Sequence, residues 1–152
     1  MASYYYEDFN IGDEWTYDAW VIEEAPLVEF ATRYDPQPMH TDAAAAAEGP
    51  YGGLIASGWQ TALNCVSPFL NDVMKNTAGL ASPGFEVFQW LKPVHADAPV
   101  VPRTKVLDKR LSNSKPDLGL VKFRFTGTDA EGDVVWKAEG TFFITARGEA
   151  DG

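Results

Sequence analysis

The second half of the chain shows the alternation of apolar and polar residues that is typical of β-strands. Stretches rich in β-branched and aromatic residues predict strands at about 84–94, 99–111, 118–129 and 133–147. Between the last two strands, the segment DAEGD (129–133) consists of turn-forming residues and predicts a hairpin. Near the N-terminus, DEWTYDAWVI (13–22) alternates in the same way and predicts one further strand.

Apolar residues recur at spacings of three and four in two other segments, and this period predicts helices. The first is EEAPLVEFATRY (23–34), and the longest is SGWQTALNCVSPFLNDVMK (57–75), in which Pro68 should kink the helix or end its first part. The alanine run at 43–47 predicts a short helix with Asp42 as N-cap. One long apolar helix followed by long, curved antiparallel strands predicts an α+β fold whose sheet wraps around the helix.

Length and charge narrow the class of protein. The chain has 152 residues, which is enough for one ordinary domain spanning residues 1–152. The net charge of -10 argues against nucleic acid as a partner, because phosphate binding needs a basic face. No apolar run approaches the roughly 20 residues that a membrane span requires. We therefore expect a globular domain that binds neither nucleic acid nor a membrane.

Cationic residues are unevenly distributed along the chain. Arg33 is the only one of the 12 Lys and Arg residues before Lys75, and several of the others cluster in RTKVLDKRLSNSK (103–115). Two interpretations of this cluster stay open. It is either a solvated strand face with alternating charges or a local basic strip that meets a small phosphorylated ligand.

The single cysteine, Cys65, allows no internal disulfide. It lies in the apolar stretch TALNCVSPFL and is expected to be a small core residue. The first residues, MASYYYEDF, lack the basic and apolar regions of a secretory signal. A reducing cytoplasm is therefore the expected location.

The segment DPQPMH sets an acid, Asp35, and the first histidine, His40, five residues apart. Pro36 and Pro38 fix φ and favour extended conformations before them, so the pattern predicts a stiff loop and not a helix. A carboxylate and an imidazole aimed at one point could hold one water molecule and move its proton. The alternative is structural, because Asp before Pro is common in turns and a loop histidine commonly lies on the surface.

The surroundings of this segment resemble the MaoC-like dehydratase family, close to its (R)-specific enoyl-CoA hydratases. The resemblance is carried by YDPQPMHTD, followed by GGLIASGW, and extends over nearly the whole chain. The family elbow is Asp-x-Asn-Pro-x-His, which Asp35, Pro38 and His40 match, with Gln37 in place of Asn. The glycine that opens the central helix corresponds to Gly58. The resemblance implies a hot-dog fold, in which a curved antiparallel sheet wraps around a long central helix.

The resemblance also implies a reaction, the reversible addition of water to a trans-2-enoyl-CoA thioester to give an (R)-3-hydroxyacyl-CoA. Asp35, as the main base, and His40 would hold the water, and the Gly58 N–H would receive the thioester oxygen. The residue that protonates C2 stays open. Gln37, Ser57 and Trp59 would contact the substrate. No metal is expected, because two histidines without ligand spacing make a poor metal site, and no other cofactor is expected. The resemblance implies a homodimer or a dimer of dimers.

Other expectations depend on single residues. Several hydratases carry a serine about two turns into the central helix, where the spacing here gives Val66, with Ser67 next to it. Gly58 has two explanations: close packing of the helix start against the elbow, or close approach of the thioester oxygen. His95 has no acidic residue at a spacing that would indicate a catalytic pair, and it is expected to be structural or on the surface.

Two other functions remain open at this point. A hot-dog acyl-CoA thioesterase usually places a carboxylate on or near the central helix, but the first acid after Gly58 is Asp72, far along that helix. A non-catalytic protein that binds acyl thioesters would have no need for both Asp35 and His40. The sequence leaves the acyl group undetermined, as well as the choice between CoA and acyl carrier protein as its carrier.

Overall fold

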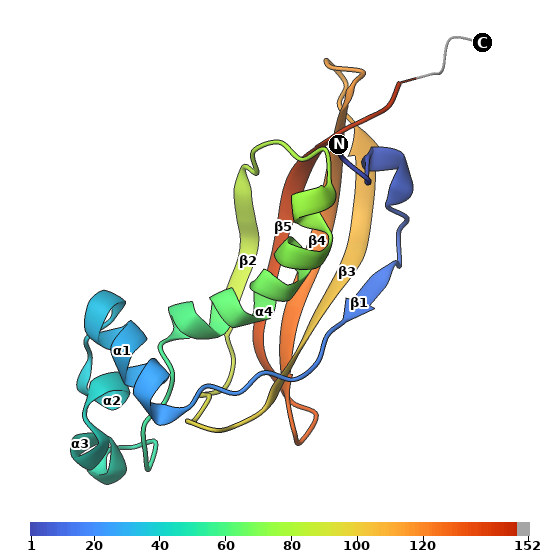
Figure 1. The fold of residues 1–152 in the computed structure, drawn as a ribbon. Coiled ribbons are helices and arrows are strands. Elements are labelled where there is room, and N and C mark those ends of the chain that lie inside the picture. The colour runs from blue at the N-terminus through green and yellow to red at the C-terminus, as the bar shows by residue number, and fades with distance from the viewer. Residues whose placement is uncertain (149–152) are drawn as a thin grey trace.

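The computed structural model describes residues 1–148 and shows one curved antiparallel sheet that wraps around a long helix (Figure 1). The sheet order is β1-β3-β4-β5-β2. Its strands are β1 (Glu14–Thr16), β2 (Gly84–Trp90), β3 (Val100–Leu111), β4 (Leu118–Asp129) and β5 (Val134–Thr145). The expected α+β arrangement is therefore confirmed, and so is the hairpin between β4 and β5, where the Asp129 N–H donates to the Asp133 carbonyl at 2.9 Å.

Two strands are shorter than the alternating pattern predicts. The segment 13–22 forms ladder pairs only over β1, and Trp20 adds a single bridge to Val100. The strand expected over 84–94 ends at Trp90, where the Leu91 and Lys92 N–H groups both turn to the Val135 carbonyl, at 2.8 and 3.3 Å. Pro93 follows and has no N–H to donate, so the ladder cannot continue through it.

The helices are α1 (Glu24–Tyr34), α2 (Pro38–Thr41), α3 (Ala43–Glu48) and α4 (Gly58–Asp72), with single 3₁₀ turns at Tyr6–Asp8 and Met74–Asn76. As expected, the Asp42 side chain caps α3, accepting from the Ala45 N–H at 3.0 Å. Pro68 does not end α4, which continues to Asp72. A proline removes only one helical hydrogen bond, and the burial of the neighbouring Phe69 against the sheet offsets that loss.

The core lies between α4 and the inner face of the sheet. Its largest fully buried side chains include Phe69 of α4, Phe123 and Phe125 of β4, and Trp136 of β5. Cys65 is buried there too, as expected, and burial raises the pKa of its thiol to about 12. Figure 1 shows α1, α2 and α3 grouped beyond the N-terminal end of α4. This arrangement brings the acidic and histidine residues of the elbow to the start of the central helix.

Two expectations concern the surface of the protein: the cationic residues of 103–115 and the lack of a membrane span. The cationic residues of 103–115 lie on β3 and just after it, and Lys109 donates to the carbonyls of Tyr6 and Phe9 at 3.3 and 2.6 Å. Within residues 1–148, no helix has both the length and the apolar character needed to cross a membrane.

Candidate active site

The elbow follows directly from the end of α1. The Asp35 N–H closes that helix by donating to the Ala31 carbonyl at 2.8 Å, and Asp35 itself leaves helical geometry. The expectation of a loop without helix is wrong for the second half of the elbow, because Pro38 begins the one-turn helix α2. Proline is suited to the first helical position, where its fixed φ is already helical and its missing N–H is not needed. His40 therefore sits on a short helix and not on an open loop.

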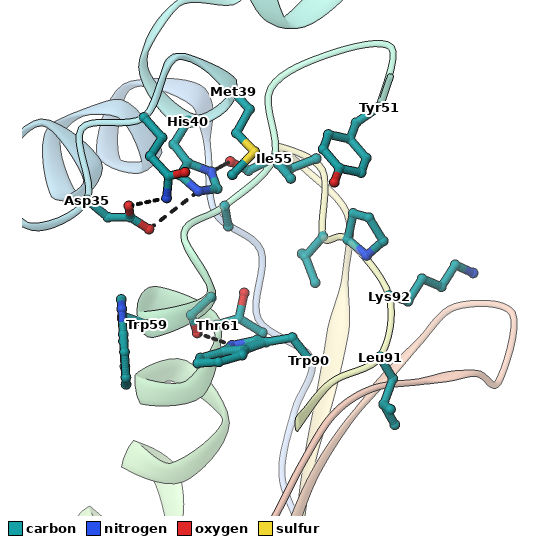
Figure 2. Close-up of a pocket in the computed structure, with 15 residues that line it drawn as sticks. Asp35, Met39, His40, Tyr51, Ile55, Trp59, Thr61, Trp90, Leu91 and Lys92 are labelled. Carbon is teal, nitrogen blue, oxygen red and sulfur yellow. Dashed lines mark hydrogen bonds and ion pairs between the residues drawn. The ribbon is translucent and has the colours of Figure 1, made fainter. Parts of the chain in front are cut away.

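Asp35 and His40 point toward one another at the edge of a cavity (Figure 2). The Nε2 atom of His40 lies 3.4 Å from Oδ2 of Asp35. The other ring nitrogen, Nδ1, lies 2.7 Å from the Ile55 carbonyl. Because a carbonyl can only accept, Nδ1 carries the proton of the neutral ring, and Nε2 presents its lone pair toward Asp35. Two acceptors thus face the same point.

Two side chains fix the Asp35 carboxylate. Gln37 Nε2 donates to Oδ1 at 2.6 Å, and the Ser57 hydroxyl donates to Oδ2 at 2.8 Å. The hydrogen bond from Gln37 is the main cause that lowers the pKa of Asp35, helped by Ser57 and His40 and opposed by burial. Asp35 is therefore ionised near neutral pH. The structure places Gln37 and Ser57 against this carboxylate, although they were expected as substrate contacts.

Replacing Gln37 with alanine is expected to raise the pKa of the Asp35 carboxyl. A lowered pKa means that Asp35 stays ionised as the pH falls, and the loss of its strongest donor moves protonation to higher pH. NMR titration of the Asp35 carboxyl carbon measures this shift without any assumption about activity. Gln89→Ala, which removes an exposed glutamine on β2, is the control and should leave the titration unchanged. An unchanged midpoint in Gln37→Ala would contradict the account.

The start of α4 forms the opposite side of the site. Ser57 is its N-cap and accepts from the Trp59 N–H at 3.3 Å. Within residues 1–148, the Gly58 N–H has no hydrogen-bond acceptor, as is usual in the first turn of a helix. A Cβ on Gly58 would overlap the Trp90 ring, whose Nε1 donates to the Gly58 carbonyl at 2.7 Å. Close packing therefore requires glycine here, although the partner is Trp90 and not the elbow.

The cavity between these two sides has a volume of about 520 Å³. Asp35, His40, Gln37, Gly58 and Trp59 line it, as the sequence suggested, whereas Ser57 lies behind Asp35. Its walls also include residues that the sequence did not single out for the site: Met39, Tyr51, Ile55, Ala56, Thr61, Trp90, Leu91, Lys92, Pro93 and Val94. Most are apolar, and four of them, residues 91–94, come from the segment that follows β2.

Three of these wall residues have a clear role in the site's geometry. Thr61 lies one helical turn after Gly58, and its buried side chain lines the cavity without a hydrogen-bond partner among the described residues. This is the helix position that faces the site, and not Val66 or Ser67. Tyr51 is held by its carbonyl, which lies 2.7 Å from His95 Nε2, so His95 is structural. Lys92 is fixed by carboxylates on the β4–β5 hairpin: Asp129, Glu131 and Asp133 at 2.7, 2.9 and 3.1 Å.

Comparison with known proteins agrees with this fold. Residues 9–127 match the family model described as "MaoC like domain", and the chain belongs to that family. It is similar to YdeM of Bacillus subtilis (strain 168), with 28% identity over 104 residues that cover 68% of this chain and 74% of YdeM.

Solved structures show the same fold. A MaoC-like dehydratase from Rhodospirillum rubrum is 29% identical, with a TM-score of 0.86 over 95% of this chain and 99% of that one. The R-hydratase PhaJ1 from Pseudomonas aeruginosa is 22% identical, with a TM-score of 0.74 over 92% and 84%. The expected hot-dog fold is thus confirmed, and it is the fold of hydratases and dehydratases of this kind.

Proposed function

We propose that the protein is a hydratase that adds water to a trans-2-enoyl-CoA thioester and gives an (R)-3-hydroxyacyl-CoA, or catalyses the reverse dehydration. The observation that carries the proposal is the convergence of the Asp35 carboxylate and His40 Nε2, 3.4 Å apart at the edge of a cavity. The Gly58 N–H, which has no acceptor within residues 1–148, begins the helix on the other side. Acid–base and oxyanion-binding groups are the two requirements of this reaction.

The geometry supports a simple course for hydration. One water donates its two hydrogens to Asp35 and to His40 Nε2, which orients a lone pair of its oxygen toward C3 of the substrate. Asp35 takes one proton as the oxygen attacks C3, and the double-bond electrons move toward the thioester oxygen. The Gly58 N–H and the positive end of α4 stabilise the negative charge on that oxygen. The proton taken from the water is then returned to C2, by Asp35 itself or by way of His40 Nε2, which restores both groups and completes the addition of H and OH.

The walls of the cavity and the groups behind Asp35 have separate roles in this proposal. Gln37 and Ser57 are positioning residues, because their hydrogen bonds hold the carboxylate in one orientation and keep it ionised. Trp59 and Thr61 are walls against which the thioester lies. The proposed steps use side chains of this chain and the Gly58 N–H, and the proposal includes no metal or other cofactor.

Activity over a panel of enoyl-CoA thioesters tests the proposal and identifies the acyl group. Short, long, branched and dicarboxylic enoyl-CoAs are each incubated with the protein, and 3-hydroxyacyl-CoA and free CoA are both quantified. Hydration of at least one thioester is expected. Release of free CoA without hydration would favour a thioesterase, although the first acid after Gly58, Asp72, is bonded to the Tyr17 hydroxyl at 3.0 Å. Binding without turnover would favour a non-catalytic protein. The cytoplasmic location stays a prediction.

We also propose that two copies pair through β2, as a homodimer or a dimer of dimers. β2 is an edge strand of seven residues that pairs only with β5, and unpaired edges invite association. Large exposed apolar side chains lie on β2, next to it or on the adjoining face of α4: Trp59, Leu63, Phe85, Trp90 and Leu91. Pairing of two edges would cover this surface.

Sedimentation velocity at micromolar concentration is expected to show a dimer or a tetramer. Leu63→Glu places a charge on the exposed face of α4, one turn from Trp59, and is expected to shift the protein toward monomer. Leu111→Glu changes a similarly exposed leucine at the far end of β3 and is the matched control. A monomeric wild-type protein would contradict the proposed pairing.

A further inference from the structure

We infer that Trp90 closes the inner end of the cavity and limits the substrate to a short acyl group. The inference rests on the proposed function and names the class of thioester that this site takes. Trp90 is the last residue of β2, and its ring lies beside the start of α4, opposite Asp35 and His40 (Figure 2).

The contacts of Trp90 fill the gap between β2 and α4. Its Nε1 donates to the Gly58 carbonyl at 2.7 Å, and its ring leaves no room for a Cβ on Gly58. The ring packs edge-to-face on Trp59 and on Phe88, with centroid distances of 5.2 and 5.1 Å. An alkyl chain cannot pass between the strand and the helix at this point without displacing the indole.

The space beyond Trp90 is already filled. Phe88 packs on Trp136 of β5 at 5.3 Å and on Phe85 at 5.6 Å. Phe85 packs on Phe125 of β4 at 6.3 Å, and Phe125 packs on Phe69 of α4 at 5.8 Å. Of these rings, Phe69, Phe125 and Trp136 are fully buried, so aromatic side chains already occupy the space between the helix and the sheet. The cavity therefore ends at Trp90 and the buried Thr61.

A long acyl chain would gain no binding free energy by lying along the cavity walls that lead away from Trp90. With the thioester oxygen at Gly58 and C3 at the elbow, the remaining walls lead to the rim at Tyr51, which is 43% exposed. Methylene groups that stay in water contribute no hydrophobic free energy. The cavity of about 520 Å³ must also hold the thioester and the start of its carrier. Affinity should therefore stop rising after the first few carbons.

The test is isothermal titration calorimetry with a series of saturated thioesters, from acetyl-CoA through butanoyl-, hexanoyl- and octanoyl- to dodecanoyl-CoA. Each buried methylene raises affinity about fourfold. In the wild type we expect this rise over the shortest members and a plateau or a fall after them. Trp90→Val removes the ring but keeps a strand-forming residue. In this variant the affinity should go on rising to longer acyl chains than in the wild type. Trp90→Phe keeps a ring, so the chain length at which the affinity stops rising should change little.

Tyr51→Ala is the matched control, because it removes an aromatic ring from the exposed rim of the same cavity and, among the described residues, that ring does not pack on Trp90. It should weaken all members alike and leave the chain-length profile unchanged. Affinity that keeps rising to dodecanoyl-CoA in the wild type would overturn the inference, even if Trp90→Val fails to fold. Equal chain-length profiles for the wild type and a folded Trp90→Val would also overturn the inference. Both results would leave the proposed function intact. If none of the thioesters binds, the proposed function fails and the inference fails with it.

Discussion

Replacing Asp35 with asparagine is expected to lower kcat for hydration at least about 100-fold, the usual scale for a general base. The amide keeps the shape of the carboxylate but cannot take a proton from the water at physiological pH. It also loses the charge that pairs with the donors Gln37 and Ser57. The melting temperature should change little, because Asp35 lies at the edge of the cavity and not in the core.

The matched control for this substitution is Asp72→Asn. Asp72 ends α4 at the far side of the molecule from the elbow, and its carboxylate accepts from the Tyr17 hydroxyl. This variant should keep wild-type kcat on the same enoyl-CoA. Near wild-type hydration by Asp35→Asn, measured beside this control, would show that the proposed mechanism is wrong.

Replacing Gly58 with alanine is expected to lower both stability and kcat. The new Cβ overlaps the Trp90 ring, so the indole must move and its hydrogen bond to the Gly58 carbonyl is strained or lost. The same Cβ crowds the position where the thioester oxygen would meet the Gly58 N–H. Loss of one such oxyanion hydrogen bond typically lowers kcat about 10²–10³-fold. The single variant cannot separate these two effects.

A double-mutant cycle with Trp90→Val separates them. Without the indole, the alanine methyl group has room, so Gly58→Ala should cost much less stability in this background than in the wild type. The fall in kcat should remain when Gly58→Ala/Trp90→Val is compared with Trp90→Val alone, on a single enoyl-CoA. If the double variant is as active as Trp90→Val, then Gly58 serves only packing and its N–H is not part of the site.

The periodic pattern of the sequence was enough to predict the sheet and its central helix. Alternation located the long strands to within a few residues, and the spacing of apolar residues located α4. The predictions were wrong where tertiary contacts or proline determine the local structure. β1 is short because most of 13–22 does not pair with β3. Pro38 begins a helix because the restriction that proline imposes applies to the residue before it, and the first position of a helix accepts proline.

Only the part of the candidate site that is local in sequence could be predicted. Asp35 and His40 lie close together in the sequence, and the short elbow between them brings their side chains together. The bond from Ser57 to Asp35 joins residues 22 positions apart, and that from Trp90 to Gly58 joins residues 32 apart. Such contacts leave no local signal. Trp90 was consequently not expected at the site, although it lines the cavity and is 45% exposed.

Mass spectrometry of a short trans-2-enoyl-CoA, such as crotonyl-CoA, after incubation with the protein shows directly whether water is added. We expect a product heavier by one water, with the thioester intact, which chiral analysis identifies as the (R)-3-hydroxyacyl-CoA. Asp35→Asn is expected to form this product far more slowly. Free CoA with a released acid, the (S) product, or equal rates for the wild type and Asp35→Asn would contradict the account.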